Sequence, residues 1–239
     1  IANISGNQAL SDVVYKWRGN IVTDGSLPSS GFEINTSPAN GDLYVKQILE
    51  IGKELERGDA EVNGDCGLHV HIDARDFKFY EIRRLIKLYS TIETALFGMV
   101  PDSRRSSNYC LPCARKYMNS VIDLGKTSYS KVRKDITKSV YGKEDTKYQR
   151  TDKYNRSRYN ALNIHSWFHR GTIEFRLFNG TMNSNKIINW GVMWAMILDH
   201  VTKSSDSEIE GMVEGTPIDN LLAITQSNDQ VSGFVKERF

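Results

Sequence analysis

The sequence predicts an α+β fold, in which an antiparallel sheet has helices packed on one of its faces. Short segments with alternating polar and apolar residues, such as 65–73 and 172–178, predict strands. Longer segments with apolar residues at helical spacing, 77–100 and 184–202, predict helices that pack against the sheet. Short turns separate neighbouring strand segments, so we expect hairpins and hence antiparallel pairing.

The 239 residues are expected to form one domain, 1–239, with an insertion or lid at about 101–152. That segment is rich in Lys, Arg, Ser and Tyr, and it predicts two short helices near 113–121 and 128–139. A basic, tyrosine-rich insertion can bind phosphates, although most such segments are solvated surface.

Composition excludes some classes of protein. The formal net charge is +2, which gives no general reason to expect nucleic acid as a partner. The apolar runs are too short to predict a membrane span, so no membrane association is expected. No secretory signal is visible, and the cysteines are few and odd in number, which favours a reducing compartment and a cytoplasmic location.

The N-terminal sequence predicts a β-hairpin between two helices, and one strand of the hairpin carries the carboxylate of Glu33. Glu33 and Asn35 fall on one face of a strand, while Phe32 and Ile34 fall on the other. Glu33 is therefore either an exposed strand residue or a ligand that points into a site. The elements expected here are a helix at 7–17, strands at 20–23 and 31–36 joined by an Asp24-Gly25-Ser26 turn, and a helix at 42–57.

The segment 65–73 is the one around which the chain is organised. As a strand, it places His69, His71 and Asp73 on one face and apolar residues on the other. Imidazole nitrogens beside a carboxylate suit a divalent cation, so this face is a candidate metal site. The alternative is an amphipathic edge strand with solvated histidines. Asp73 is expected to end the strand and cap the following helix.

The second half repeats the polar pattern. The alternation in 172–178 places Thr172, Glu174 and Arg176 on one face of a strand. Either Glu174 and Arg176 belong to a polar site, or they pair with neighbours on a structural sheet face. The other elements expected here are a strand at 159–166, a turn at 169–171 and helices at 184–202, 218–225 and 230–238.

Cys110 and Cys113 have the spacing of half a zinc site or of a redox pair. The chain contains no second pair to complete a zinc ribbon. We therefore favour incidental thiols over a metal or redox function.

Together the strands predict one polar sheet surface that carries two histidines, two glutamates and an arginine. Such side chains can hold Mg²⁺ or Mn²⁺, and an arginine presents a planar donor pair to a phosphate or carboxylate. Metal, arginine and carboxylates fit phosphoryl transfer, where catalysis is mostly positioning and charge neutralisation. The residues are Glu33, His69, His71, Glu174 and Arg176.

These segments resemble those of a known family. Gly67-Leu68-His69-Val70-His71 is similar to the Gly-Met-His-x-His segment of glutamine synthetases, and Thr172-Ile173-Glu174-Phe175-Arg176 is similar to their Ile-Glu-x-Arg segment. The closer resemblance is to the putative amidoligases, relatives of glutamine synthetase and glutamate–cysteine ligase. The further motifs that carry it are Asp24-Gly25-Ser26-Leu27, Phe32-Glu33-Ile34 before Ser37-Pro38, and Tyr159 to Asn163, in the family's order.

The resemblance implies a glutamine synthetase catalytic-domain-like sheet that binds ATP and Mg²⁺ or Mn²⁺. It implies carboxylate–amine ligation through an acyl phosphate, with a small-molecule or peptide carboxylate and an amine acceptor as substrates. It also implies roles for individual residues: His69 and Glu174 as metal ligands, Glu33 as a catalytic residue and ligand of another metal, His71 and Asn163 as cofactor-binding residues, and Arg176 as both cofactor-binding and catalytic.

One family motif is missing. The family's first strand carries a Gly-x-Glu-x-Glu segment, and nothing upstream of Asp24 matches it. The chain begins at Ile1, so we expect that the strand precedes this fragment. The alternatives are a degenerate amidoligase fold that acts as a binding or structural module, and a metal-dependent phosphohydrolase that uses the same His and Glu face.

Overall fold

The computed structural model describes residues 8–23, 27, 31–118, 125, 127–142 and 147–239. The contacts within the chain divide it into two compact units, each described here by itself. The first unit comprises 1–68 and 179–190, and the second comprises 69–178 and 191–239. The expectation of one domain over 1–239 stays a prediction.

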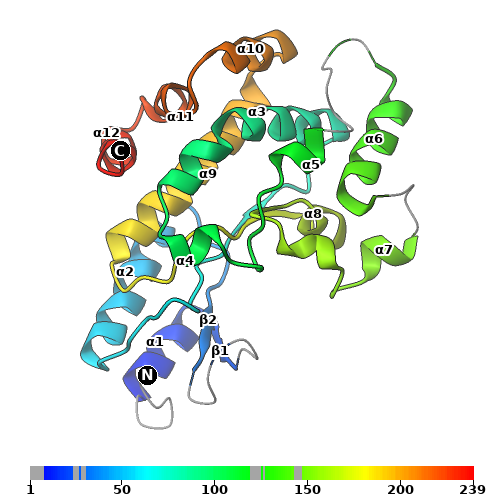
Figure 1. Ribbon diagram of the computed structural model, residues 1–239. Helices are drawn as coiled ribbons and strands as arrows, with labels where there is room; N and C mark the ends of the chain where they lie inside the picture. The colour runs from blue at the N-terminus through cyan, green and yellow to red at the C-terminus, as the bar shows by residue number, and fades with distance from the viewer. Residues whose placement is uncertain (1–7, 24–26, 28–30, 119–124, 126, 143–146) are drawn as a thin grey trace. The chain divides into compact units, whose positions relative to one another are not determined.

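Both units combine helices with a small antiparallel sheet, which confirms the α+β class (Figure 1). The described strands form two sheets, whereas the sequence predicted a single one. One sheet has two strands and the other has three. Each sheet is small because every described strand is only two to four residues long, which limits how many ladder hydrogen bonds they form.

The first unit is a hairpin packed with two helices, as predicted. Ile34 lies opposite Ile21 in the hairpin, and both pack against a cluster formed by Leu10, Val14 and Ile51 of the helices. The apolar spacing of the helices thus faces the apolar side of the hairpin. The predicted Asp24-Gly25-Ser26 turn lies outside the described residues. The elements are α1 (Gln8–Lys16), β1 (Asn20–Val22), β2 (Glu33–Asn35) and α2 (Gly41–Arg57).

The second unit holds a three-stranded antiparallel sheet with β5 in the centre. Ile173 and Phe175, on one face of β5, are fully buried. The ring of Phe175 stacks on Trp194 with ring centroids 3.7 Å apart, so this face forms core. The opposite face carries Glu174. The strands, in sheet order, are β3 (Val70–Asp73), β5 (Thr172–Phe175) and β4 (Leu162–Asn163).

Long helices appear where apolar spacing predicted them. They are α3 (Phe79–Gly98) and α9 (Ser184–Lys203), whose residues 191–203 belong to the second unit. The C-terminal helices α10 and α11 contact α3, α12 contacts α11, and all three are coloured orange to red in Figure 1. Two of them, α11 (Pro217–Thr225) and α12 (Asp229–Lys236), were predicted, whereas α10 (Asp206–Gly211) and the short 3-10 helix η3 (Met212–Glu214) were not.

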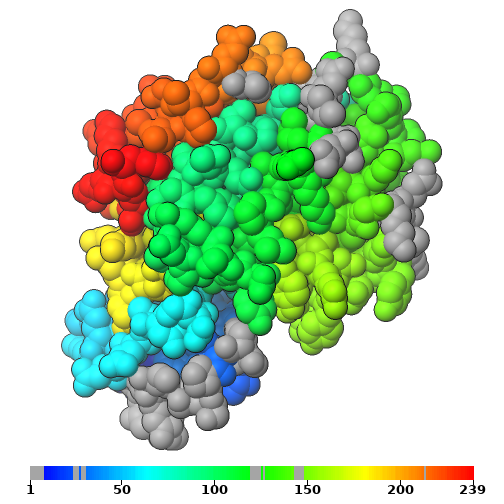
Figure 2. Space-filling view, in the orientation of Figure 1, coloured from blue at the N-terminus to red at the C-terminus, as the bar shows by residue number. Residues whose placement is uncertain are grey.

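The basic segment 101–152 contributes to the core of the second unit. Tyr117 and Ile136 are fully buried, and their helices pack on α3. In Figure 2 the green atoms of this segment lie directly against their neighbours in the unit. Its role as a lid stays a prediction. The described helices are α4 (Asp102–Arg105), α5 (Ala114–Met118), α6 (Tyr129–Tyr141) and α7 (Lys147–Thr151).

The predicted strand at 159–166 is wrong over most of its length. Within it, the structure has only the short strand β4, which lies between the 3-10 helix η2 (Arg156–Tyr159) and α8 (His165–Arg170). Helix α8 replaces the predicted turn at 169–171. It ends at Gly171, whose φ of 78° is the left-handed conformation that favours glycine after a helix.

All three cysteines are free thiols, and Cys110 and Cys113 are buried. Burial raises the pKa of the Cys113 thiol well above its ordinary value, which makes it a poor nucleophile or metal ligand. The preference for incidental thiols is consistent with this geometry. Among the described residues, no helix has the length and apolar character needed to cross a membrane.

Candidate active site around Glu174

Glu174 occupies the middle strand of the second unit's sheet. Its register neighbours are His71 on β3 and Asn163 on β4, so three strands bring polar side chains to one point. Glu174 is only 6% exposed. A carboxylate at that depth requires ionic or hydrogen-bonding partners, because its desolvation is costly.

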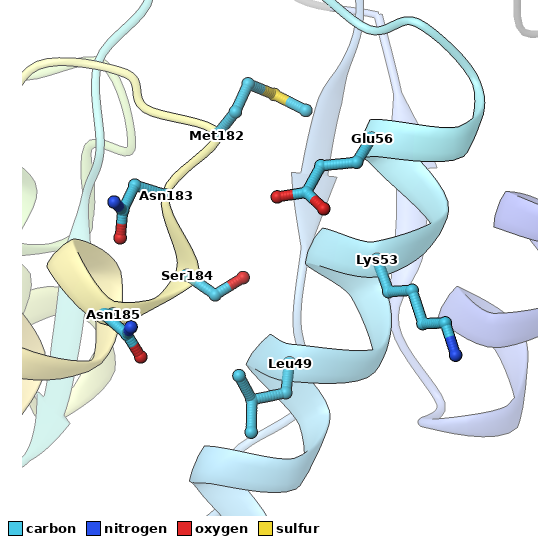
Figure 3. Close-up of a pocket in the computed structure, with 7 residues that line it drawn as sticks. All are labelled: Leu49, Lys53, Glu56, Met182, Asn183, Ser184 and Asn185. Carbon is cyan, nitrogen blue, oxygen red and sulfur yellow. The ribbon is translucent and has the colours of Figure 1, made fainter.

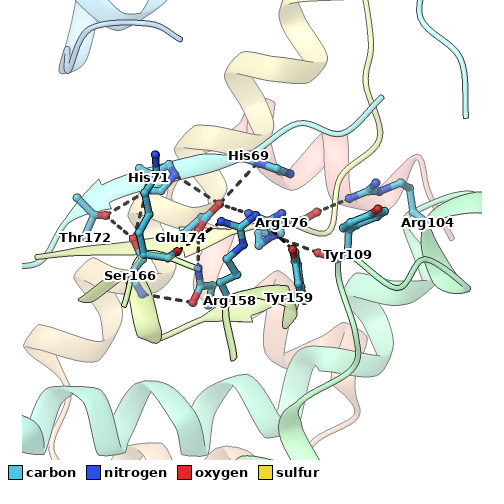
Figure 4. A network of polar contacts seen from close by, with 12 residues as sticks. His69, His71, Arg104, Tyr109, Arg158, Tyr159, Ser166, Thr172, Glu174 and Arg176 are labelled. Atoms are coloured by element: carbon cyan, nitrogen blue, oxygen red, sulfur yellow. Dashed lines mark hydrogen bonds and ion pairs between the residues drawn. The ribbon is translucent and has the colours of Figure 1, made fainter. Parts of the chain in front are cut away.

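The partners of Glu174 are the residues that the sequence predicted (Figure 4). Arg176 Nη1 donates to Oε1 at 2.6 Å, and Asn163 Nδ2 donates to Oε2. His69 Nδ1 and His71 Nε2 lie 3.6 and 3.5 Å from Oε1. The structure thus brings five of the six predicted site residues together on one carboxylate.

The electrostatics of the cluster fix its protonation states. Burial opposes the ionisation of Glu174, but the hydrogen bond from His71 and the charge of Arg176 outweigh it and hold the pKa of Glu174 well below its ordinary value. Burial, followed by the charge of Arg176, lowers the pKa of His69 to about 3. At neutral pH, Glu174 is therefore an anion and His69 a neutral imidazole.

The side chain of Arg176 is held from several directions. Its Nε donates to the carbonyl of Tyr109 at 3.1 Å, and its guanidinium lies 6.0 Å from the ring centroid of Tyr159. Arg104, which is 3% exposed, donates to the carbonyl oxygens of Arg176 and Leu177 at 2.6 and 3.1 Å. This buried guanidinium satisfies two backbone carbonyl groups immediately after β5.

His71 is oriented by hydroxyl groups on its other nitrogen. Thr172 Oγ1 lies 3.1 Å from His71 Nδ1 and 2.9 Å from Ser166 Oγ. The Ser166 backbone N–H, in turn, donates to the side-chain carbonyl of Asn163. These contacts direct His71 Nε2 toward Glu174 and hold Asn163 against the same carboxylate. Thr172 and Ser166 were not predicted as site residues.

The donor types suit a divalent cation. A neutral imidazole and an ionised carboxylate are ligands that Mg²⁺ or Mn²⁺ accepts, and His69 and Glu174 supply them. In the described part of the chain, however, no group of three or more His, Cys, Asp and Glu side chains has an arrangement that could hold a metal ion. Arg176 pairs with Oε1, the oxygen that both imidazoles approach.

Two other predicted residues lie elsewhere. Glu33 is in β2 of the first unit, opposite Val22, and its metal and catalytic roles stay predictions. Asp73 does not cap α3, whose N-cap position is Lys78. Instead, both Asp73 oxygens accept hydrogen bonds from the Arg75 guanidinium, and these bonds lower the pKa of Asp73 to about 2.

A cavity of about 70 Å³ adjoins Glu174, and most of its lining was not predicted. The signal in the sequence was the basic and tyrosine-rich composition near residue 150. That signal could not be told from solvated surface, because contacts between elements decide which basic side chains face a cavity. The lining comprises Lys153, Arg158, Asn163, His165, Ser166, His169, Arg170, Glu174 and Arg176.

The first unit has a larger and more open hollow of about 560 Å³, between α2 and the segment that begins α9 (Figure 3). Lys53 and Glu56 line one wall, and Asn183 and Asn185 line the other. No residue predicted from the sequence to act in catalysis lines this hollow.

The comparisons with known proteins assign the family. Residues 10–198 match the family model described as putative amidoligase enzyme. No curated protein and no solved structure matches the chain, so the glutamine synthetase-like fold stays a prediction. The matched span includes Glu33 and the whole cluster around Glu174. Because it covers most of the chain, the protein belongs to the putative amidoligase family, a family of ligase-type enzymes.

Proposed function

We propose that this protein is a carboxylate–amine ligase that uses ATP with Mg²⁺ or Mn²⁺. A carboxylate oxygen of the acid substrate attacks the terminal phosphorus of ATP, and the bond from that phosphorus to ADP breaks. The amine nitrogen of the second substrate then attacks the acyl carbon, phosphate leaves, and the nitrogen loses a proton. The products are an amide, ADP and phosphate. The acid is a small molecule or a peptide.

The observation that supports this proposal most is the buried, ionised carboxylate of Glu174 with Arg176 and two imidazoles directed at one of its oxygens. Such a group of charges has a structural cost, since buried ion pairs often contribute little to stability. In a member of a ligase-type family, this buried cluster is best explained by a role in binding or activating a charged substrate.

Arg176 is the residue that we assign to the transferred phosphoryl group. Its Nε and Nη1 are held by Tyr109 and Glu174, which fixes the plane of the guanidinium. A pre-oriented cation stabilises the negative charge of the transition state without reorganisation during the reaction. Fixing the guanidinium also reduces the entropy lost on binding phosphate.

His69 and Glu174 of the second unit are the residues that we expect to hold one divalent cation, and Glu33 of the first unit is expected to hold another. A bound Mg²⁺ would neutralise phosphate charge that otherwise repels the acid substrate. The low pKa of His69 keeps its nitrogen lone pair available at neutral pH. His71 and Asn163 are expected to contact the nucleotide, and both are positioned by Ser166.

The first experiment measures nucleotide binding and turnover. Calorimetry with ATP and Mg²⁺ should show binding by the native protein, and ADP should form only when a suitable acid and amine are both present. Glu174→Gln should lower turnover at least about a hundredfold, as expected when a group that orients catalytic charge is lost. Asp199→Asn, an exposed carboxylate change on α9, is the matched control and should keep full activity.

Oxygen labelling separates this reaction from hydrolysis. An acid substrate with ¹⁸O in its carboxylate should transfer one labelled oxygen to the released phosphate. Phosphate release that needs no amine and carries no label would identify a phosphohydrolase instead. Failure to bind ATP at millimolar concentration with Mg²⁺ or Mn²⁺ would overturn the proposal and favour a binding module.

A further inference from the structure

We propose that the 70 Å³ cavity beside Glu174 is a binding site for an oxyanion, either a phosphate or a carboxylate group. The cavity is formed by η2, α8, the end of β5 and the residues that precede η2. Its lining combines charge, directed donors and small size in a way that suits an anion.

The charge of the lining is strongly positive. Four cationic side chains face one carboxylate, Glu174, and that carboxylate already pairs with Arg176 at 2.6 Å. The remaining three cations are Lys153, Arg158 and Arg170. Among the described residues, none of these three forms an ion pair with a carboxylate. Cations gathered around a small cavity repel one another, and a bound anion removes that repulsion.

Arg158 is held in place before any ligand arrives. Its guanidinium lies 4.9 Å from the ring centroid of Tyr159 and 5.4 Å from that of Tyr154, and its Nη2 donates to the Tyr159 hydroxyl at 3.3 Å. In Figure 4 its side chain points toward Glu174. Its Nε is buried and has no hydrogen-bond partner among the residues that the structure describes. A buried donor without a partner is costly, and an oxyanion would supply the acceptor.

Two imidazole rings, His165 and His169, complete the lining of the cavity. His165 is fixed by the Tyr141 hydroxyl at 2.8 Å on Nδ1 and by the Asp152 carbonyl at 3.0 Å on Nε2, and burial lowers the pKa of His165. His169 stacks on His165 with centroids 5.7 Å apart. The nearby Asp152 carboxylate does not line the cavity and accepts from the Tyr154 backbone N–H.

The size of the cavity limits the ligand. About 70 Å³ holds one phosphate or carboxylate group, whereas whole cofactors occupy pockets of roughly 300 Å³ or more. The cavity therefore takes a free anion or the anionic end of a larger ligand. That end is either a nucleotide phosphate or a second carboxylate of the acid substrate, an assignment that rests on the proposed function.

Anion binding can be measured without turnover. Inorganic phosphate and glutarate would be titrated separately into the native protein by calorimetry. The variant Arg158→Gln/Arg170→Gln should weaken the binding of the preferred anion at least about tenfold, since each lost charge-assisted hydrogen bond accounts for roughly that factor. Arg115→Gln, an exposed charge change on α5, is the matched control and should bind as tightly as the native protein.

The two anions distinguish the sources. Phosphate binding that ATP with Mg²⁺ displaces would assign the cavity to the nucleotide. Glutarate binding that leaves ATP affinity unchanged would assign it to the acid substrate. Binding of neither anion at millimolar concentration, or equal binding by the double variant and the native protein, would overturn the inference.

The test is separable from that of the proposed function. Ligase activity without anion binding would count against the cavity alone. Anion binding without nucleotide-dependent activity would count against the proposed function alone.

Discussion

The buried ion pair between Arg176 and Glu174 predicts a large loss of stability when one partner is removed. The two side chains are 11% and 8% exposed and lie 2.6 Å apart. Replacing Arg176 by Met leaves the Glu174 carboxylate buried without its cation. Breaking a buried pair in this way costs about 3–5 kcal/mol. Because Asn163 and two imidazoles still face the carboxylate, we expect the lower end, about 3 kcal/mol.

The assay is urea unfolding followed by far-UV circular dichroism, with a thermal melt as a second measure. For a chain of this length, a loss of about 3 kcal/mol corresponds to a fall in Tm of roughly 6–12 °C. A double-mutant cycle with Glu174→Gln should give a coupling free energy of about 1–3 kcal/mol, because the second substitution removes the charge that the first one strands.

A matched control is the exposed pair between Lys203 and Asp199 on α9, whose side chains are 75% and 56% exposed. Lys203→Met should cost at most about 1 kcal/mol. If Arg176→Met cost no more than this control, or if the effects of Arg176→Met and Glu174→Gln were additive, the reasoning about the buried pair would be refuted.

The pKa of His69 in the folded protein is about 3, below its ordinary value of 6.5. Between these pH values the unfolded chain binds more protons, so the free energy of unfolding falls as the pH falls. In urea titrations at stepped pH, His69→Gln should lose less of its free energy of unfolding over this range than the native protein. Trp194→Ala should destabilise the protein by about 3–5 kcal/mol, while Tyr148→Ala, at a side chain 76% exposed, should change stability by less than about 0.5 kcal/mol in the same assay. Gly171→Ala and Gly142→Ala both place alanine at a positive φ, which should lower the free energy of unfolding by about 1 kcal/mol. Only at Gly171 would the new Cβ also meet a neighbouring side chain, so thermal or urea unfolding should show the larger loss of stability for Gly171→Ala.

Each of these has a result that would contradict it. An acid slope unchanged by His69→Gln would mean that other groups dominate acid unfolding. Equal losses for Trp194→Ala and Tyr148→Ala would contradict the assigned core. Equal losses for the two glycine variants would show that backbone conformation alone sets the cost.

The sequence predicted the central features of the site because strand alternation is a local property. The period of two placed Glu174 and Arg176 on one face, and the structure pairs them. The same parity placed His69 and His71 together, and both approach Glu174. What the pattern could not supply was the direction of Arg158, whose position depends on contacts between η2 and the rest of the unit.

The errors have identifiable physical causes. Ala161, Asn163 and His165 alternate with other residues as they would in a strand, and all three are buried. The chain nevertheless leaves the sheet after Asn163 and enters α8, so His165 is buried as part of a helix. Helix α10 was missed although its capping box was visible: Ser205 and Glu208 satisfy each other's backbone N–H groups.

The polarity of 101–152 was also misleading. Arg104 is only 3% exposed, because its guanidinium satisfies carbonyl groups that follow β5. Composition alone cannot distinguish such an arginine from a solvated one, since the difference lies in the hydrogen-bond acceptors that another part of the chain presents.

The position of Glu174 between two edge strands also determines how the sheet is aligned. Its neighbours on β5, Ile173 and Phe175, lie opposite Ile72 and Val70 of β3. A shift of β3 by one residue would place an apolar side chain opposite the carboxylate and turn His71 to the other face of the sheet. Such a misaligned sheet would bury the charge of Glu174 without the imidazole of His71 beside it. The carboxylate to which we assign a catalytic role thus also specifies the register of β3 on β5, because a shifted pairing would be less stable.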